Sequence, residues 1–241
     1  MKVRIAAIIP ARYASTRFPG KPLAEINGKP MIEHVYQRVV GIEEIADVII
    51  ATDDKRIYQR VEDFGGTAVM TADDIKSGTD RIARVAYEIE ADLIVNIQGD
   101  EPILKKEMVQ EAISPFYENP DLLMSTLKKE IVDEEELNNH NIVKVVTDKK
   151  GYALYFSRYP IPYQRNKGAV YYKHIGLYVY NKQFLLKYSK LKQTPLEQSE
   201  SLEQLRVLEN GYKIKVVETR YNSIGVDVPE DINKIEKLLN K

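Results

Sequence analysis

The sequence feature that most constrains this chain is a short apolar run that leads directly into a basic loop. Residues 5–9 are apolar and rich in isoleucine, which is typical of a parallel strand buried on both faces. Arg12, Arg17 and Lys21 follow, with no acidic residue before Glu25. At an effective dielectric of roughly 20, these like charges repel one another by about a few kcal/mol in total. We therefore expect an anion to bind among them, and phosphate is the leading candidate.

The basic loop is predicted to lie at the carboxyl end of its strand, the edge where open α/β sheets bind their ligands. Pro10, Pro19 and Pro22 restrict its backbone, and Ser15 can offer a hydroxyl beside main-chain amides. The spacing differs from a Walker A phosphate loop, which has glycine at the position of Ser15 and Ser or Thr at that of Pro22. The alternative is a solvated basic loop that binds nothing.

The composition excludes several classes of function. The formal net charge is -1 and the positive charge is concentrated in one loop, which argues against nonspecific nucleic-acid binding. The chain has no cysteine, so disulfides, thiol nucleophiles and thiolate metal sites are excluded. The sequence shows no signal peptide and no apolar run near the roughly 18 residues that a membrane span needs. These features predict a cytoplasmic protein that acts on neither nucleic acid nor membrane.

Strands and helices alternate through the first half of the chain, which predicts an α/β fold with a mostly parallel, Rossmann-like sheet in three layers. Apolar, β-rich runs lie at residues 47–52, 67–71 and 93–100, and amphipathic helical patterns separate them. Asp53 and Asp54 are expected to cap the helix that runs to Phe64. One large α/β domain over residues 1–241 suits this length.

The second half has a less regular pattern. It predicts a hairpin over residues 142–157, a strand over residues 173–180, a helix over residues 202–208 and a strand over residues 212–218. The acidic run at residues 133–136 is interpreted as solvent-facing. A last helix is expected to pack inward through four residues, Ile232, Ile235, Leu238 and Leu239.

Two segments of the first half carry further candidate site residues. Ser77 and Arg81 lie in SGTDR at a predicted helix start, where the simpler role is a helix cap. Gln98 and Asp100 lie at the tip of the run over residues 93–100, on the same sheet edge as the basic loop. Because Mg²⁺ takes one or two carboxylates plus substrate phosphates, Asp100 suits a metal site, although strand-end aspartates are often only solvated.

The second half carries a different kind of candidate site. Arg158 lies in SRYPIPY, and His174 and Tyr178 lie in KHIGLYVY. Taken singly, a loop arginine is usually solvated and a lone histidine is usually structural. Arginine can nevertheless bind a carboxylate through two hydrogen bonds, and histidine and tyrosine can bind hydroxyls. Glu203 and Gln204 lie in LEQLR, and this segment by itself predicts that both are exposed residues of a helix.

Together, these motifs resemble the 3-deoxy-D-manno-octulosonate (Kdo) cytidylyltransferase family over nearly the whole chain, and PARYASTRFPGKPL is similar to the nucleotide-binding signature of sugar-activating nucleotidyltransferases. The resemblance implies transfer of CMP from CTP to Kdo, giving CMP-Kdo for lipopolysaccharide synthesis. The implied nucleotide-binding residues are Ala11, Arg12, Ser15, Arg17, Lys21, Ser77, Arg81 and Asp100. The implied sugar-binding residues are Gln98, Arg158, His174, Tyr178, Glu203 and Gln204.

The resemblance also implies a metal and a catalytic set. Mg²⁺ would be held by Asp100 and Asp227, and Arg12 and Lys21 would complete the catalytic residues. Asp227 lies just outside the last predicted helix. A metal clamp built from acids so far apart in the sequence forms only when the chain folds.

Within the single domain, residues 1–120 would mainly bind the nucleotide, and residues 121–241 would mainly bind the sugar and the partner of a homodimer. The Tyr-rich strands near Tyr171 and Tyr180 are a candidate dimer contact. Two alternatives stay open. CMP-sialic acid synthetases and hexose-1-phosphate nucleotidyltransferases share the implied fold and a related glycine-lysine loop. A nucleotide-sensing protein without catalysis is the other alternative, although the two metal-site acids argue against it.

Overall fold

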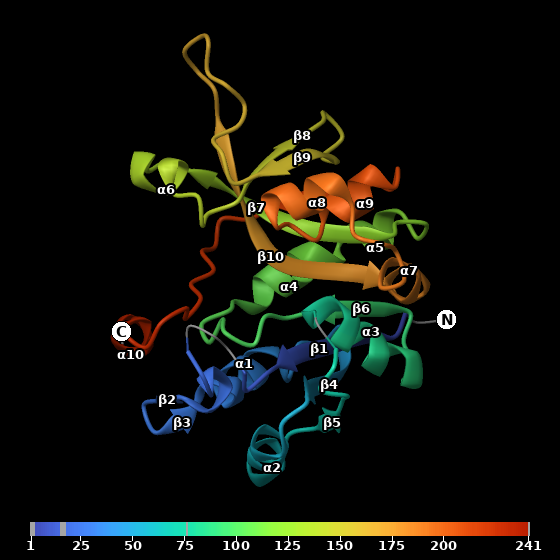
Figure 1. Ribbon diagram of the computed structural model, residues 1–241, viewed down its shortest axis with the longest axis vertical. Coiled ribbons are helices and arrows are strands. Elements are labelled where there is room, and N and C mark those ends of the chain that lie inside the picture. The colour runs from blue at the N-terminus through green and yellow to red at the C-terminus, as the bar shows by residue number, and fades with distance from the viewer. Residues whose placement is uncertain (1–2, 15–17, 76, 241) are drawn as a thin grey trace. The chain divides into compact units, whose positions relative to one another are not determined.

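The computed structural model of the protein describes residues 3–14, 18–75 and 77–240, so Ser15 and Arg17 of the predicted phosphate site lie outside the described residues. The chain forms two compact units (Figure 1). One contains the residues up to Val109 together with those from Ser223 onwards, and the other is Gln110–Asn222. This division differs from a simple cut near residue 120, because the C-terminal segment belongs to the first unit.

The sheet of the first unit is parallel, as predicted. β1 (Ile5–Ala11) pairs with β4 (Ile45–Thr52) on one side and with β6 (Leu93–Asn96) on the other, and β5 (Ala68–Met70) pairs with β4. β6 ends four residues before the predicted strand end at residue 100. Gln98 and Asp100 therefore lie in the turn that follows the strand, at the carboxyl edge of the sheet.

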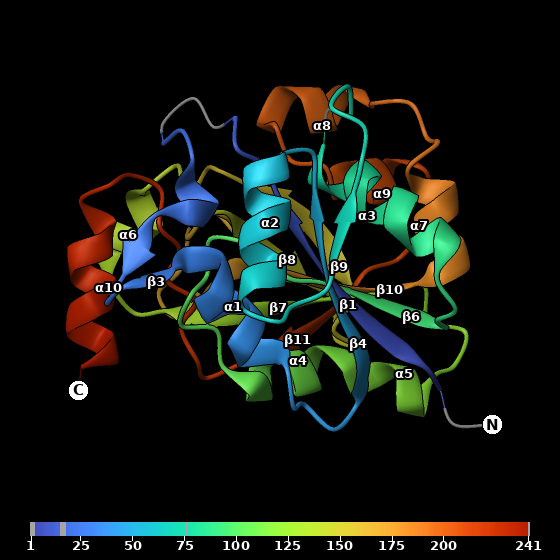
Figure 2. The same ribbon diagram turned by 90° about the horizontal axis from the view of Figure 1, so that it is seen from below.

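Helices cover both faces of this sheet, which confirms the expected three layers. Figure 2 shows α1 (Met31–Val39) and α2 (Lys55–Asp63) on one side of β1 and β4, and α3 (Gly78–Glu88) on the other. Asp54 caps α2 by accepting a hydrogen bond from the Arg56 amide at 2.9 Å, whereas Asp53 does not cap it. Ser77 caps α3, as predicted, by accepting from the Asp80 amide at 3.0 Å.

The segment after the basic loop packs against the C-terminal segment. It contains the 3-10 helix η1 (Lys21–Leu23) and the short antiparallel strands β2 (Glu25–Ile26) and β3 (Lys29–Pro30), and the chain ends in α10 (Asp231–Leu239). They share a small apolar cluster of four buried residues, Ile26, Met31, Val226 and Ile235. The prediction that Leu238 packs inward is wrong, since 42% of it is exposed.

The second unit has a mixed sheet. β7 (Met124–Ile131) pairs antiparallel with β10 (Tyr171–Asn181) and parallel with β11 (Lys215–Glu218). β8 (Lys144–Thr147) and β9 (Ala153–Ser157) form the predicted hairpin, and β8 also pairs with β10. Tyr180 in β10 is only 1% exposed, whereas Tyr171 at the start of the same strand is partly exposed. The dimer contact near these residues stays a prediction.

Short helices complete the second unit. The chain enters this unit within α4 (Lys106–Ile113), and the helices that follow are α5 (Pro115–Glu118), α6 (Glu134–Asn138), α7 (Lys182–Tyr188), α8 (Pro195–Glu200) and α9 (Leu205–Glu209). None of the helices in the described part of the chain has the length and apolar character that crossing a membrane requires.

One expectation for these helices is wrong, and another holds for three of the four residues that it concerns. α9 begins three residues later than predicted, so Glu203 and Gln204 precede it, and Gln204 is only 5% exposed. The acidic run is not wholly solvent-facing, because Glu136 in α6 forms an ion pair with Lys173, whose Nζ lies 2.6 Å from Oε1 and 2.8 Å from Oε2.

Candidate functional site

Three distant segments of the chain meet at Lys21. Its Nζ donates to Asp100 Oδ2 at 2.5 Å and to the Val226 carbonyl at 2.9 Å. The Val226 amide in turn donates to the Asp100 carbonyl at 2.9 Å. The basic loop, the turn after β6 and the C-terminal segment are therefore joined at one point, and Asp227 directly follows the residue that joins them.

The backbone of Asp100 is therefore hydrogen-bonded to the segment that carries Asp227. The Asp227 side chain is exposed, and its amide donates to Asp231 Oδ2 at 3.0 Å, as does the Val228 amide at 3.2 Å. Asp231 therefore orders the turn around Asp227, in addition to its predicted place at a helix start.

This donor set fits a magnesium ion better than a closed metal cage. Among the described residues there is no group of three or more His, Cys, Asp or Glu side chains that could hold a metal. Mg²⁺ keeps several waters and binds through one or two carboxylates plus substrate phosphates. Asp100 and Asp227 could supply those carboxylates, with the rest coming from a phosphate-bearing ligand.

Gly99 allows the turn after β6 to lie against β1. A Cβ atom at this position would lie 2.8 Å from the Pro10 carbonyl oxygen, a distance that real Cβ contacts do not show. Any larger residue would push Asp100 away from the end of β1, where the basic loop begins.

A hydrogen bond between Tyr13 and Gly20 joins the two ends of the basic loop. The Gly20 amide donates to the Tyr13 carbonyl at 2.9 Å, and a Cβ on Gly20, whose φ is +72°, would lie 3.1 Å from the Tyr13 ring. The Arg56 guanidinium lies 3.3 Å from the centroid of that ring and is held by Asp54. The loop is therefore anchored on α2.

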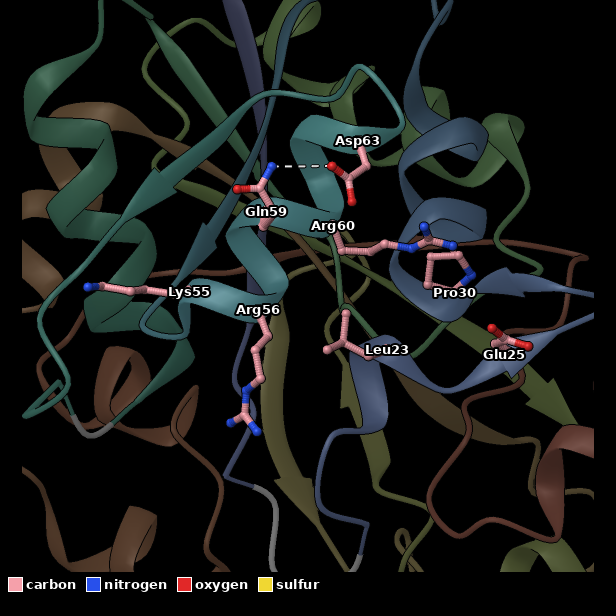
Figure 3. A pocket seen from close by; sticks show the side chains of 8 residues that line it. All are labelled: Leu23, Glu25, Pro30, Lys55, Arg56, Gln59, Arg60 and Asp63. Carbon is pink, nitrogen blue, oxygen red and sulfur yellow. Dashed lines mark hydrogen bonds between the residues drawn. The ribbon is translucent and has the colours of Figure 1, made fainter.

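A pocket of about 620 Å³ lies between α2 and the η1–β3 segment (Figure 3). Its lining residues are Leu23, Glu25, Pro30, Lys55, Arg56, Gln59, Arg60 and Asp63. Figure 3 shows the hydrogen bond from Gln59 Nε2 to Asp63 Oδ1, which is 3.2 Å long. None of the predicted site residues lines this pocket, so it is distinct from the candidate site.

The predicted base-site residues also lie at the carboxyl edge of the first unit's sheet. Arg81 is fully buried and donates to Asp53 Oδ2 at 2.6 Å. Burial lowers the pKa of Arg81, and the carboxylate of Asp53 opposes that shift. Arg12 Nε lies 3.7 Å from the same Asp53 oxygen, and Ala11 ends β1 beside them. Sequence reasoning missed Asp53 because it treated the residue only as a helix cap.

Three of the predicted sugar-binding residues come together in the second unit. The rings of His174 and Tyr178 lie 5.3 Å apart, and His174 Nε2 lies 2.9 Å from Thr126 Oγ1. Burial lowers the pKa of His174 to about 3, so its ring stays neutral. Burial raises the pKa of Tyr178, and the nearby Tyr180 and Glu203 raise it further. Neutral hydrogen-bonding groups of this kind suit a polyhydroxylated ligand.

Arg158 has a different environment from the one predicted. Its guanidinium donates to three backbone carbonyls, those of Glu200 at 2.7 Å, His140 at 3.2 Å and Ser201 at 3.3 Å. The Glu200 carboxylate accepts from the Arg158 amide at 2.9 Å and from Ser157 Oγ at 2.8 Å. In this arrangement the guanidinium braces the loop before α9. Gln98 lies in the first unit, where its Nε2 donates to Asn96 Oδ1 at 3.3 Å.

Comparison with known sequences points to one family. Residues 6–214 match the profile described as Cytidylyltransferase. A 3-deoxy-manno-octulosonate cytidylyltransferase of Geotalea daltonii is 53% identical, and the alignment covers 97% of each chain. An enzyme of the same name from Fusobacterium nucleatum is also 53% identical, over 97% of this chain and 96% of the relative.

Comparison with solved structures agrees. A structure of CMP:2-keto-3-deoxy-manno-octonic acid synthetase complexed with CTP superposes with a TM-score of 0.95 at 44% identity, covering 98% of both chains. A 4-diphosphocytidyl-2C-methyl-D-erythritol synthase of Anaerococcus prevotii superposes over the full length of both chains with a TM-score of 0.65 at 17% identity, which is a likeness of fold.

Proposed function

The chain belongs to the cytidylyltransferase family, and we propose that it transfers the CMP group of CTP to Kdo, giving CMP-Kdo and pyrophosphate and so activating Kdo for lipopolysaccharide synthesis. The anomeric hydroxyl of Kdo would attack the α-phosphate of CTP. The observation that carries the proposal is the meeting of Lys21, Asp100 and the Asp227 segment. This meeting supports the proposal, because a cation, one carboxylate and the backbone that carries the second aspartate come together at one point.

The basic loop would bind the triphosphate. Arg12 and Lys21 would neutralise its charge, and Ser15 and Arg17 of the same loop would add further donors. In-line phosphoryl transfer needs positioning and charge neutralisation more than covalent help from the protein. Lys21 would steady the charge that develops at the reacting phosphate, because its ammonium is held beside Asp100.

Asp100 and Asp227 would hold a divalent ion, which we propose to be Mg²⁺. When bound, the ion would polarise the phosphate and lower the pKa of the attacking sugar hydroxyl. The chain's own residues order the backbone that carries the two aspartates: the Val226 amide donates to the Asp100 carbonyl, and Asp231 accepts from the Asp227 amide.

The cytosine and ribose would bind between the end of β1 and the start of α3, with Ser77, Arg81 and Ala11 as contacts. The proposed sugar contacts are Gln98, His174, Tyr178, Glu203 and Gln204. Arg158 remains a proposed sugar contact, although its bonds to backbone carbonyls favour a bracing role. Residues 1–120 would mainly serve the nucleotide and residues 121–241 the sugar, within one catalytic domain.

A cytoplasmic location and a homodimer are part of the proposal. The exposed aromatic residues of the second unit, Tyr159 at 69% and Tyr163 at 89%, support a dimer contact better than Tyr180 does. Sedimentation at several protein concentrations would measure the oligomeric state, and a concentration-independent monomer would contradict the dimer.

The proposed reaction is tested by supplying CTP, Mg²⁺ and a panel of acceptors to the purified protein. We expect pyrophosphate release with Kdo, and we expect CMP-Kdo as the product identified by mass spectrometry. Faster release with sialic acid or a hexose phosphate would assign a related sugar. CTP binding without pyrophosphate release for any acceptor would indicate a nucleotide-sensing protein.

A further inference from the structure

Two arginines of the first unit meet on a single carboxylate oxygen. Arg81 Nη2 donates to Asp53 Oδ2 at 2.6 Å, and Arg12 Nε lies 3.7 Å from the same oxygen. The Arg81 side chain is fully buried, and the Asp53 side chain is only 12% exposed. One carboxylate therefore lies between a fully buried arginine and a second arginine whose side chain is 39% exposed, and the interaction of the buried pair is strong because little water surrounds it.

The register of the parallel strands creates this arrangement. Ala11 of β1 lies opposite Thr52 of β4, and Thr52 lies opposite Met70 of β5. The residues that directly follow the three strands therefore form a row along the carboxyl edge of the sheet, in the order Arg12, Asp53 and Thr71.

Arg81 reaches this row from the first turn of α3. Its Nη1 donates to Thr71 Oγ1, which in turn donates to the Thr52 carbonyl at 3.1 Å. These contacts fix the two ends of the guanidinium on Asp53 and Thr71. The Nε atom of Arg81 is buried and has no hydrogen-bond partner among the described residues. A buried donor without a partner is uncommon in folded proteins, and it favours a ligand acceptor at this point.

We propose that Asp53 is a positioning residue that couples recognition of the nucleotide base to binding of the triphosphate. The inference rests on the proposed function, in which Arg81 belongs to the base site and Arg12 to the triphosphate site. Because both arginines share one oxygen, a change in how Arg81 is held changes the attraction on Arg12. A nucleotide that satisfies both arginines is then bound more tightly than the separate contributions of its base and its phosphates would give.

The coupling is measured with two ratios of dissociation constants from titration calorimetry in Mg²⁺ buffer. The ratio of the UTP constant to the CTP constant reports base discrimination, and the ratio of the CMP constant to the CTP constant reports the triphosphate contribution. Asp53→Asn keeps the shape of the side chain and removes its charge. We expect both ratios to fall by about fivefold or more, the lower end of typical coupling between sites.

A second variant keeps the test open if Asp53→Asn fails to fold, since a buried arginine without its partner is strongly destabilising. Asp53→Glu retains the charge but moves the carboxylate by one methylene, so it should fold and lower both ratios together. Asp47→Asn is the matched control, because Asp47 is an aspartate of β4, the strand that Asp53 follows, and it pairs with Arg4 at 2.8 Å at the surface. It should leave both ratios unchanged.

The proposal is overturned if a folded Asp53 variant keeps both ratios, if only one ratio changes, or if Asp47→Asn changes them equally. None of these readouts requires turnover. Failure of the wild-type protein to form CMP-Kdo would therefore reject the proposed function, whereas unchanged affinity ratios in the variants would reject only the role of Asp53.

Discussion

The ammonium of Lys21 lies 2.5 Å from the carboxylate of Asp100, although the two residues are 79 positions apart in the chain. The Asp100 carboxylate is also the proposed ligand of a divalent ion. The structure therefore holds, side by side, the cation proposed to steady the reacting phosphate and one of the acids proposed to hold the metal. Substitutions of Lys21 or Asp100 should therefore lower the rate of catalysis more than they lower the affinity for the nucleotide.

Lys21→Met, which keeps most of the side-chain length and removes the charge, should lower the rate of CMP-Kdo formation by roughly 10²- to 10³-fold, the usual effect of losing one preorganised donor at a reacting centre. The rate is measured by coupled pyrophosphate release at saturating CTP and Kdo. Lys29→Met is the matched control, because Lys29 is an exposed lysine of the following hairpin that pairs with Glu33 at 3.0 Å. A Lys21 variant with near wild-type turnover would remove this residue from the mechanism.

Asp227→Asn should weaken the apparent affinity of the enzyme for Mg²⁺, because one of two proposed ligand carboxylates is lost. We expect the Mg²⁺ concentration for half-maximal rate to rise by roughly 10- to 100-fold, as changes around metal ligands commonly cause. The measurement is a magnesium titration of the initial rate. Glu230→Gln, an exposed acid three residues away, should leave the titration unchanged. An unchanged curve for Asp227→Asn would place the metal elsewhere.

Gly99→Ala should destabilise the protein, because the new Cβ would lie 2.8 Å from the Pro10 carbonyl. Overpacking of this kind costs about 1–3 kcal/mol, and the shift of Asp100 should also lower turnover. Gly78→Ala is the matched control, since its Cβ would make only ordinary contact with Pro10 at 3.6 Å. Chemical denaturation gives the two free energies of unfolding. Equal stability of both variants would show that the turn is not confined at Gly99.

His174 should make the stability of the protein fall in acid. Its pKa in the folded protein is about 3, below its ordinary value of 6.5, so the unfolded chain binds more protons between these values. Stability therefore decreases as pH falls from about 6.5 towards 3, with a slope approaching about 1.4 kcal/mol per pH unit. His174→Gln should remove this part of the slope in denaturation measured from pH 7 to pH 4. His140→Gln, on an exposed loop, is the control, and identical slopes for wild type and His174→Gln would contradict the prediction.

Arg158→Met should lower thermal stability, because the guanidinium holds the carbonyls of His140, Glu200 and Ser201. If bracing is its main role, the KM for Kdo should change by less than about threefold, since a lost charged hydrogen bond to substrate would cost about 1.5–3 kcal/mol and a larger change. Thermal unfolding and steady-state kinetics are measured on the same variant. A large rise in the KM for Kdo at unchanged stability would instead support Arg158 as the residue that binds the carboxylate of Kdo.

Much of the fold could be predicted from sequence because its signals are local. The apolar runs of β1 and β4, the helical spacing in α1 and the cap at Ser77 each depend on residues close together in the chain. The helices α7 and α8 gave no comparable signal, since α7 has only seven residues, with three of them buried, and α8 buries only Glu197. Packing against the rest of the second unit decides whether such segments become helical.

The sequence by itself determined the alternation of strands and helices, the concentration of positive charge after β1, and the motifs that place the chain in its family. Only the tertiary structure decided that Asp53 joins Arg12 and Arg81, that Arg158 braces carbonyls, and that the Asp227 segment joins the basic loop. The physical reason is that propensity and periodicity act over a few residues. The partner of a charged group, in contrast, depends on strand register and on contacts between segments that are distant in the chain.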